Sequence, residues 1–367
     1  MIYALSFLAS IALLYISKGM ERDKSVVLVA IAIAIPCLLA AFRDSSVGTD
    51  VEVWGIWVYQ SARKMPLIPF LEAQAGEAAI GFNLLAWLGA NLGGGMAGYL
   101  GLIQLATVLP FMLAVKKVYP EYLWIGMTFY LLFIFPPSLN VMKQMIAVSI
   151  AFYGIVFIFS GSLIKYFVCI LIALMFHQTA IVALPIYSIV RYVIGDSDKE
   201  KNTRKIKMIA IVTAIAFAAV FCFGERLVLL LSALKESYAN EVDTLGKGDF
   251  NWSILVLLVG VTMTCCAVYA RSETSIWHDN KMILMLYLFV CGCLLFELGV
   301  ISPALSRFSY YGTSFLSLVM CGIYEKQALG KKGFAALCLI LTAYFVFNYV
   351  VRGAGEIYPY SFAMFNC

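Results

Sequence analysis

The run SVVLVAIAIAIPCLLAA (residues 25–41) decides the fold, because it contains no charged residue and is bounded by Lys24 and Arg43. A helix of this composition is apolar on every side, which is stable in lipid and not in water. Similar apolar runs follow one another along the chain, at residues 2–17, 98–115, 121–135, 141–160, 164–177, 178–194, 208–223, 252–270, 282–298, 308–324 and 333–350. The pattern predicts an all-α polytopic membrane protein, a bundle of about 12 transmembrane helices.

The overall composition excludes the other fold classes. Of the 367 residues, 63% are hydrophobic and 13% are charged, and the mean hydropathy is +0.91. A soluble domain has roughly 45–50% apolar and about 25% charged residues. A soluble globular fold and a disordered chain are therefore excluded, and the uninterrupted runs are unlike the alternating strands of an outer-membrane barrel. With no low-complexity linker, residues 1–367 are interpreted as one transmembrane domain.

One short apolar run, residues 78–92, differs from the others. It carries Asn83 and Asn91 and ends in Gly93-Gly94-Gly95. We interpret it as a re-entrant or surface helix that does not span, within an external segment at residues 42–97. A re-entrant segment is tolerated at membrane depth only beside packed protein or a wet cavity, so it predicts a cavity. A second external loop is expected at residues 224–251.

The distribution of basic residues predicts the orientation. The segment RYVIGDSDKEKNTRKIK (191–207) carries six Lys and Arg residues and is the best cytoplasmic candidate. If 78–92 does not span, 17 of the 26 Lys and Arg residues fall on the cytoplasmic side and 9 outside, with both termini external. The net charge of +5 is thus explained by cytoplasmic loops and indicates no nucleic-acid partner. The 10 Cys residues mostly lie in apolar runs and form no CxxC pair, so neither a metal nor a cofactor is expected.

Polar residues next to the spans are the candidate site, because burying a charge in a membrane costs several kcal/mol. The predicted topology places the whole set on the external face: Arg43, Thr49, Asp50, Asn140, Lys143, Gln144, His177, Arg307, Tyr310 and Tyr311. Each also has a structural interpretation. Arg43 and Lys143 can snorkel, Asp50 and Asn140 can cap helices, His177 can be a core histidine, and the two tyrosines fit an aromatic belt.

Taken together, these residues predict a cationic pocket with several hydrogen-bond donors and one candidate base. Two or three fixed cations without a carboxylate cluster suit a phosphate or pyrophosphate. Their charge would stabilise a leaving group without a metal ion. His177 has the side-chain type whose pKa suits proton transfer at neutral pH. No P-loop, GxSxG, HExxH or dinucleotide fingerprint favours another reaction.

Five stretches resemble one known family. They are AFRDSSVGTDVEVW (41–54), SLNVMKQMIAVSIAFYG (138–154), ALMFHQTAIVALPIY (173–187), SRFSYYG (306–312) and IYPYSF (357–362). They are similar to the EpsG family of exopolysaccharide biosynthesis proteins, which are grouped with Wzy-type O-antigen and capsule polymerases. The resemblance implies a GT-C-like glycosyltransferase of the bacterial inner membrane. It would transfer a glycan from undecaprenyl pyrophosphate to another lipid-linked repeat unit on the periplasmic face, without metal and with inversion.

The resemblance also suggests roles for single residues. The family's Arg-then-Gly-Thr-Asp element falls on Arg43 and 48–50, its Phe-His element on 176–177, and its Arg-x-x-Tyr element on 307–310. Its Asn-x-x-Arg-Gln element falls on residues 140–144 with a departure, because Lys143 stands where Arg is usual. Arg43, Lys143 and Arg307 would hold the donor pyrophosphate. His177 is the first choice of base and Asp50 the second, while Asn140, Gln144, Thr49, Tyr310 and Tyr311 would orient substrate oxygens.

Three other functions stay open at this point. A transporter or flippase of lipid-linked glycans also needs cations within the membrane, but typically has paired broken helices in matching halves, which we do not find. An O-antigen ligase uses the same donor with another acceptor. A scaffold of an export complex would tolerate alanine throughout the polar set. Expected partners are lipid-linked oligosaccharide donor and acceptor, membrane lipids and a chain-length regulator protein.

Overall fold

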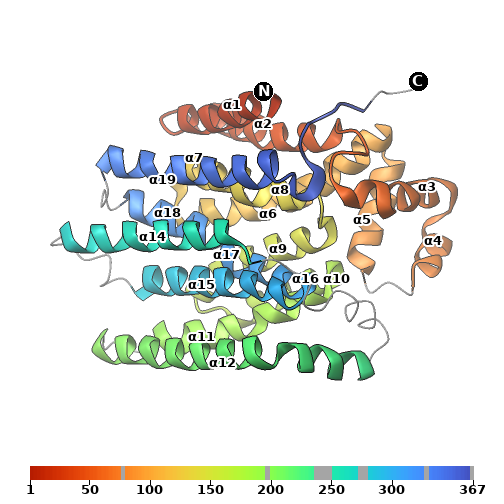
Figure 1. The fold of residues 1–367 in the computed structure, drawn as a ribbon. Coiled ribbons are helices and arrows are strands. Elements are labelled where there is room, and N and C mark those ends of the chain that lie inside the picture. The colour runs from red at the N-terminus through yellow and green to blue at the C-terminus, as the bar shows by residue number, and fades with distance from the viewer. Residues whose placement is uncertain (76–78, 195–198, 235–249, 272–279, 326–329, 364–367) are drawn as a thin grey trace. The chain divides into compact units, whose positions relative to one another are not determined.

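The computed structural model describes the chain except for residues 76–78, 195–198, 235–249, 272–279, 326–329 and 364–367 (Figure 1). Contacts divide it into two compact units, Met1–Leu184 with Leu341–Cys367 (unit 1) and Pro185–Ile340 (unit 2). Within the described ranges the secondary structure is helical, without strands, and one isolated antiparallel bridge joins Arg43 to Phe362. The predicted all-α class is confirmed.

The described helices of unit 1 include three of span length, α2, α6 and α9, together with shorter helices. They are α1 (Ile2–Ser17), α2 (Arg22–Ala41), η1 (Val51–Gly55), α3 (Ile56–Lys64), α4 (Leu67–Ala73), α5 (Ile80–Asn91), α6 (Gly95–Val118), η2 (Pro120–Tyr122), α7 (Leu123–Phe129), η3 (Tyr130–Ile134), α8 (Phe135–Ser138), α9 (Met142–Phe159), α10 (Leu163–Phe176), η4 (Gln178–Ala183), η9 (Val346–Val351) and η10 (Ala354–Glu356).

Unit 2 holds the helices α11 (Leu184–Ile194), α12 (Lys199–Leu234), α14 (Trp252–Arg271), α15 (Asn280–Glu297), η7 (Leu298–Val300), α16 (Pro303–Ser306), η8 (Arg307–Ser309), α17 (Tyr310–Thr313) and α18 (Leu316–Glu325). A final helix, α19 (Gly330–Phe345), runs from unit 2 into unit 1. In unit 2, α15 packs so closely on α17 that a Cβ on Gly292 would overlap the Thr313 amide nitrogen. Small residues at such crossings are typical of membrane helices.

Six described helices have the length and hydropathy of membrane spans, and four shorter apolar helices of 10–17 residues accompany them. The six are Arg22–Ala41, Gly95–Val118, Met142–Phe159, Arg204–Arg226, Lys281–Val300 and Lys332–Val351. This supports a polytopic membrane protein but not the expected count of about 12 crossings. The shortfall has a physical cause, since several apolar runs do not fold as one regular helix.

Three runs show this interruption. The run 121–135 changes from α-helix to π-helix at Tyr130. The run 178–194 begins as the 3-10 helix η4, and the run 308–324 is divided among η8, α17 and α18. The run 78–92 forms α5, whose 12 residues extend about 18 Å and are too few for a straight crossing.

In unit 1, α6 and α9 run side by side in the same direction. Near their starts, Tyr99 and Met142 share one buried cluster with Val51 and Phe82, and further along, the Phe111 and Phe152 rings stack at 4.6 Å. Helix α2 runs opposite to α6, because Ala41 at its end lies against Gly101 near the start of α6. The end of α2 and the starts of α6 and α9 therefore meet at one end of the unit.

Candidate functional site

Arg43 lies at this end of unit 1, directly after α2, and its side chain is only 3% exposed. Its Nη1 donates to the Leu139 carbonyl at 2.8 Å and its Nη2 lies 3.2 Å from the Met142 sulfur, while its Nε has no hydrogen-bond partner. Burial lowers the pKa of Arg43 to about 10, opposed by the charges of Tyr3 and Asp50. The guanidinium is therefore protonated at neutral pH, and it is held by the protein itself.

The segment after Arg43 binds the start of α9. The Thr49 amide and hydroxyl both donate to the Asn140 Oδ1, at 2.8 and 3.1 Å, and Asp50 Oδ2 accepts from the Met142 amide at 3.2 Å. Gly48 has a φ of +87° and its Cα is so close to α8–α9 that a Cβ would lie 2.6 Å from the Leu139 oxygen. We call residues 43–50 together with 139–142 the polar junction.

The C-terminal segment covers the polar junction. The Glu356 carbonyl accepts from the Gly48 amide at 3.1 Å, and the Ser361 carbonyl accepts from the Asp44 amide at 2.9 Å. Gly355, with a φ of +69°, approaches so near that a Cβ on it would overlap the Asn140 Nδ2. Residues 357–362 were predicted to matter only because they resemble a stretch of a known family. The paired Gly353 and Gly355 were the signal that the backbone turns sharply here.

Lys143 lies in the first turn of α9, beside the polar junction. Its ammonium is 4.5 Å from the centre of the Trp54 ring and 5.5 Å from that of Phe82. Trp54 belongs to η1, a π-helix, which is a local structure often found at functional sites. The next residue, Gln144, is buried, with 2% exposure. The Lys143 side chain is thus half-buried and held on an aromatic surface.

His177 ends α10, at the same end of unit 1 as the start of α9, because α10 folds back along α9. Its Nδ1 lies 2.7 Å from the Thr179 hydroxyl and accepts from the Thr179 amide at 3.3 Å. The side chain therefore caps the 3-10 helix η4. When Nδ1 accepts from an amide, the proton of the neutral ring lies on Nε2.

Arg307, Tyr310 and Tyr311 belong to unit 2. Arg307 is exposed at the start of η8, Tyr310 is half-buried and Tyr311 is buried. The expectation that these three residues join the polar junction stays a prediction.

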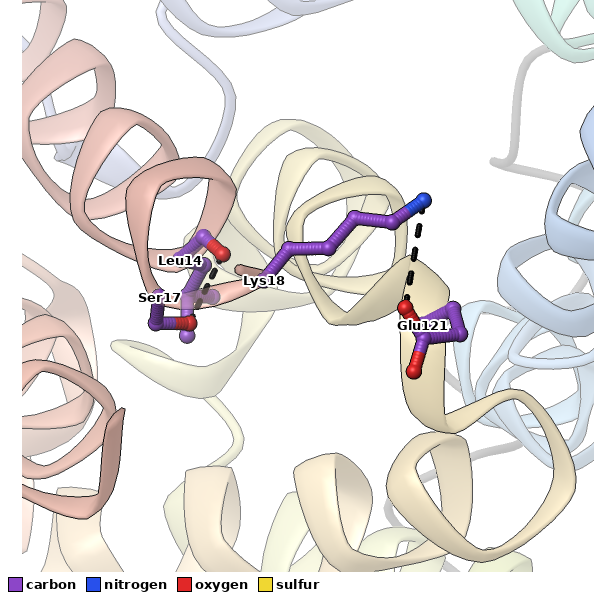
Figure 2. A network of polar contacts seen from close by, with 4 residues as sticks. All are labelled: Leu14, Ser17, Lys18 and Glu121. Atoms are coloured by element: carbon purple, nitrogen blue, oxygen red, sulfur yellow. Dashed lines mark hydrogen bonds and ion pairs between the residues drawn. The ribbon is translucent and has the colours of Figure 1, made fainter. Parts of the chain in front are cut away.

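The opposite end of unit 1 is basic. Figure 2 shows Lys18, after α1, extending toward Glu121, and the Lys18 Nζ lies 4.0 Å from the Glu121 Oε2. Beside it, the Ser17 hydroxyl donates back to the Leu14 carbonyl at 2.8 Å and helps to end α1. Lys116 and Lys117 in the last turn of α6 also lie at this end, as does Lys165 at the start of α10. Unit 1 therefore separates a lysine-rich end from the polar junction.

An apolar groove of about 1050 Å³ connects the two ends. Its walls are α2 from Val26 to Phe42 and α6 from Ala97 to Lys116, with the end of α5 beside them. Small side chains, among them Ala34 and Gly101, leave the space open. At one end the groove reaches Phe42, the residue before Arg43, and at the other end it reaches Lys116.

No group of three or more His, Cys, Asp or Glu side chains among the described residues is arranged to hold a metal ion. The polar side chains at this end include amides, hydroxyls and cations, which suit oxygen-rich ligands, beside the carboxylates of Asp44 and Asp50.

The fold and these features define a polytopic α-helical membrane protein with an apolar groove between two span-like helices and a polar junction that begins directly after Phe42, where the groove ends. The family model of the EpsG family matches residues 26–362, nearly the whole chain. The chain belongs to the EpsG family, a Wzy-like polysaccharide polymerase family. Searches of curated proteins and of solved structures gave no match.

Proposed function

We propose that this protein polymerises lipid-linked oligosaccharide repeat units at the periplasmic face of the bacterial inner membrane. The donor is a glycan on undecaprenyl pyrophosphate, and the acceptor is the non-reducing sugar of a second repeat unit. The acceptor hydroxyl oxygen bonds to the anomeric carbon, the bond from that carbon to the pyrophosphate breaks, and the carrier leaves as undecaprenyl pyrophosphate. A direct displacement of this kind inverts the anomeric centre.

The observation that carries the proposal is that the polar junction begins at the residue after Phe42, where the apolar groove ends, in a chain of a polysaccharide polymerase family. A polyprenyl chain is the occupant that this groove suits, because its walls from Val26 to Phe42 and from Ala97 to Leu113 are apolar and belong mostly to two span-like helices. The head of such a lipid would lie beside Arg43. A pyrophosphate carries the negative charge that this cationic end attracts.

The charge distribution supports the periplasmic face. Lys18, Lys116, Lys117 and Lys165 share the end of unit 1 that is opposite to the polar junction. Lys and Arg accumulate in cytoplasmic loops of membrane proteins, so the lysine-rich end is expected in the cytoplasm. The polar junction then faces the periplasm.

The cations have two different roles in this proposal. Lys143, held on Trp54, contacts the donor pyrophosphate and stabilises the charge that develops on the leaving group. Arg43 is a positioning residue, since its guanidinium already donates to Leu139 and its side chain is almost fully buried. Its charge adds to the positive potential of the site. Arg307 is proposed as the second direct phosphate contact, because it is exposed.

Two residues are candidates for the base that takes the proton of the acceptor hydroxyl. His177 is the first choice because imidazole accepts protons near neutral pH. Asp50 is the second. In this structure both side chains accept a hydrogen bond from a backbone amide, His177 from Thr179 and Asp50 from Met142. Asn140, Gln144, Thr49, Tyr310 and Tyr311 are proposed to orient sugar or phosphate oxygens.

The test is glycan length in a strain that lacks the gene and carries a plasmid-borne variant. We expect Lys143→Met to leave single repeat units. The matched control is Lys165→Met, which removes a lysine 5.8 Å from the Phe157 ring at the opposite end of unit 1 and should leave full-length polymer. Equal ladders from both variants would remove Lys143 from the mechanism.

A second measurement separates the proposed reaction from its neighbours. Purified protein with one defined lipid-linked repeat unit should give products of two or more units on a gel. Absence of products, together with unflipped precursor in the deletion strain, would identify a flippase. Normal-length polymer that is not attached to its final anchor would identify a ligase.

A further inference from the structure

A second cavity, of about 510 Å³, lies in unit 1 between α4, α5 and α10. This volume is within the roughly 300–1,000 Å³ of small-molecule pockets. Its outer walls are exposed apolar side chains, Ile80, Leu171 and Met175. Two primary amides, Gln74 and Asn83, are the polar side chains that line it. The cavity is therefore apolar at its mouth and polar deeper inside.

Both amides are deeply buried and incompletely hydrogen-bonded. Gln74 is 4% exposed and Asn83 is 3% exposed. The Gln74 Nε2 and the Asn83 Oδ1 have no hydrogen-bond partner. An unpaired buried polar atom costs about 1–3 kcal/mol, so leaving two on one cavity without a ligand is unfavourable. Packing alone would favour an apolar residue at both positions.

We infer that this cavity is a subsite for a sugar that carries a 2-acetamido group. A secondary amide has one N–H donor and one carbonyl acceptor, which complement the unpaired acceptor of Asn83 and the unpaired donor of Gln74. The acetyl methyl group suits the Leu171 and Met175 walls. The described residues that line the cavity carry no charge, so a phosphate or a carboxylate is not its ligand.

The position of the cavity connects it to the proposed active site, and the inference rests on the proposed polymerase function. Asn83 follows Phe82, whose ring is 5.5 Å from the Lys143 ammonium. Met175 lies two residues before His177 at the end of α10. A sugar in this cavity would be a non-reacting residue of the glycan, held beside the residues that carry out transfer.

The experiment uses the purified full-length protein in detergent and two probes, methyl N-acetylglucosaminide and methyl glucoside. Binding is measured by saturation-transfer NMR, in which the acetyl methyl signal reports the contact. Wild type is expected to bind the acetamido sugar more tightly than the glucoside. Asn83→Leu and Gln74→Met should each raise the Kd for the acetamido sugar about 5–10-fold, because each removes one hydrogen bond. Gln60→Met, on the exposed side of α3, is the matched control and should bind as wild type.

Thermal unfolding gives a second readout, because a purely structural role of either amide would predict a lower unfolding midpoint in its variant. Replacing an unpaired buried amide by an apolar side chain should leave the midpoint unchanged or raise it, so loss of binding with retained stability supports a ligand site. Equal affinity for the two sugars, or unchanged binding in Asn83→Leu, would overturn the inference. A wild-type protein that binds the acetamido sugar but forms no polymer would instead refute the proposed function alone.

Discussion

Replacing Gly48 by alanine tests whether the polar junction is held together as the structure indicates. Gly48 has a φ of +87°, a conformation that costs an L-residue roughly 1–2 kcal/mol. Its new Cβ would also lie 2.6 Å from the Leu139 carbonyl oxygen and 3.0 Å from the Arg43 Nη1. The two segments must then move apart at the hydrogen bond between Arg43 and Leu139. A hydrogen bond with a charged donor contributes about 1.5–3 kcal/mol.

Gly93→Ala is the matched control for this change. Gly93 has nearly the same backbone conformation, with a φ of +91°, but no atom lies within 4 Å of its Cβ position. Both variants carry the conformational cost, and only Gly48→Ala carries the contact with Leu139. The expected difference in stability is therefore about 1.5–3 kcal/mol.

The assay is thermal unfolding of the two purified variants in the same detergent, together with polymer length in complemented cells. A difference of this size corresponds to a gap of roughly 2–4 °C between the midpoints for a chain of this length. Gly48→Ala should also give short products or single repeat units, because the lost contact separates the segment of Asp50 from α9. Equal midpoints and equal ladders for Gly48→Ala and Gly93→Ala would refute this reading of the junction.

Three further predictions concern proton transfer, charge and the lipid groove. His177→Asn and Asp50→Asn each keep a side-chain oxygen that can accept a hydrogen bond from the local backbone amide, but each removes a base. The variant at the true base should lose about 10²–10⁴-fold in polymerisation rate, and the other variant should retain activity. Rate loss in neither variant would exclude both residues as base. Lys143→Arg should polymerise at least as well as wild type, because a guanidinium keeps both the charge and the contact with an aromatic face and adds bidentate binding of phosphate. Single repeat units from this variant would contradict the role of charge at this position. Ala34→Phe fills the apolar groove and should shorten the polymer, as measured by glycan ladders. The control Ala12→Phe, at an exposed position on α1, should leave polymer length unchanged. Identical ladders from the two variants would exclude the groove as the lipid site.

The apolar runs predicted the long helices well because burial in lipid depends on composition alone. The run 25–41 forms α2, 98–115 lies within α6, and 141–160 matches α9. The same signal could not predict the interruptions. Whether a run stays regular depends on the tertiary contacts that each turn makes, as with the change to π-helix at Tyr130.

Part of the predicted convergence of polar residues is seen in unit 1, and the contacts of each side chain could not be predicted. Thr49, Asp50 and Asn140 were predicted to converge, and the structure brings them together within hydrogen-bond distance at the start of α9, which Asp50 caps. The burial of Arg43 was not predictable. Its partner is the backbone carbonyl of Leu139, and a carbonyl leaves no mark in the sequence. Gln74, which directly follows α4 and lines the second cavity, gave no signal either. A single glutamine in a sequence is as consistent with the end of a helix as with a ligand site.

Arg43 presents the clearest physical question in unit 1, since a protonated guanidinium is almost fully buried and no described carboxylate lies within ion-pair distance. Holding such a charge is unfavourable, so either its geometry or its charge must serve the site. Two substitutions separate these roles. Arg43→Gln keeps a hydrogen-bond donor without charge, and Arg43→Lys keeps the charge without the planar fork. If Arg43 only positions the segment 43–50, glutamine should retain polymer length better than lysine. If its charge also stabilises the pyrophosphate, as we propose, lysine should retain more activity, and its advantage should shrink at high salt to the extent that the site is open to solvent. Equal and complete polymerisation in both variants would show that neither property of Arg43 serves the reaction.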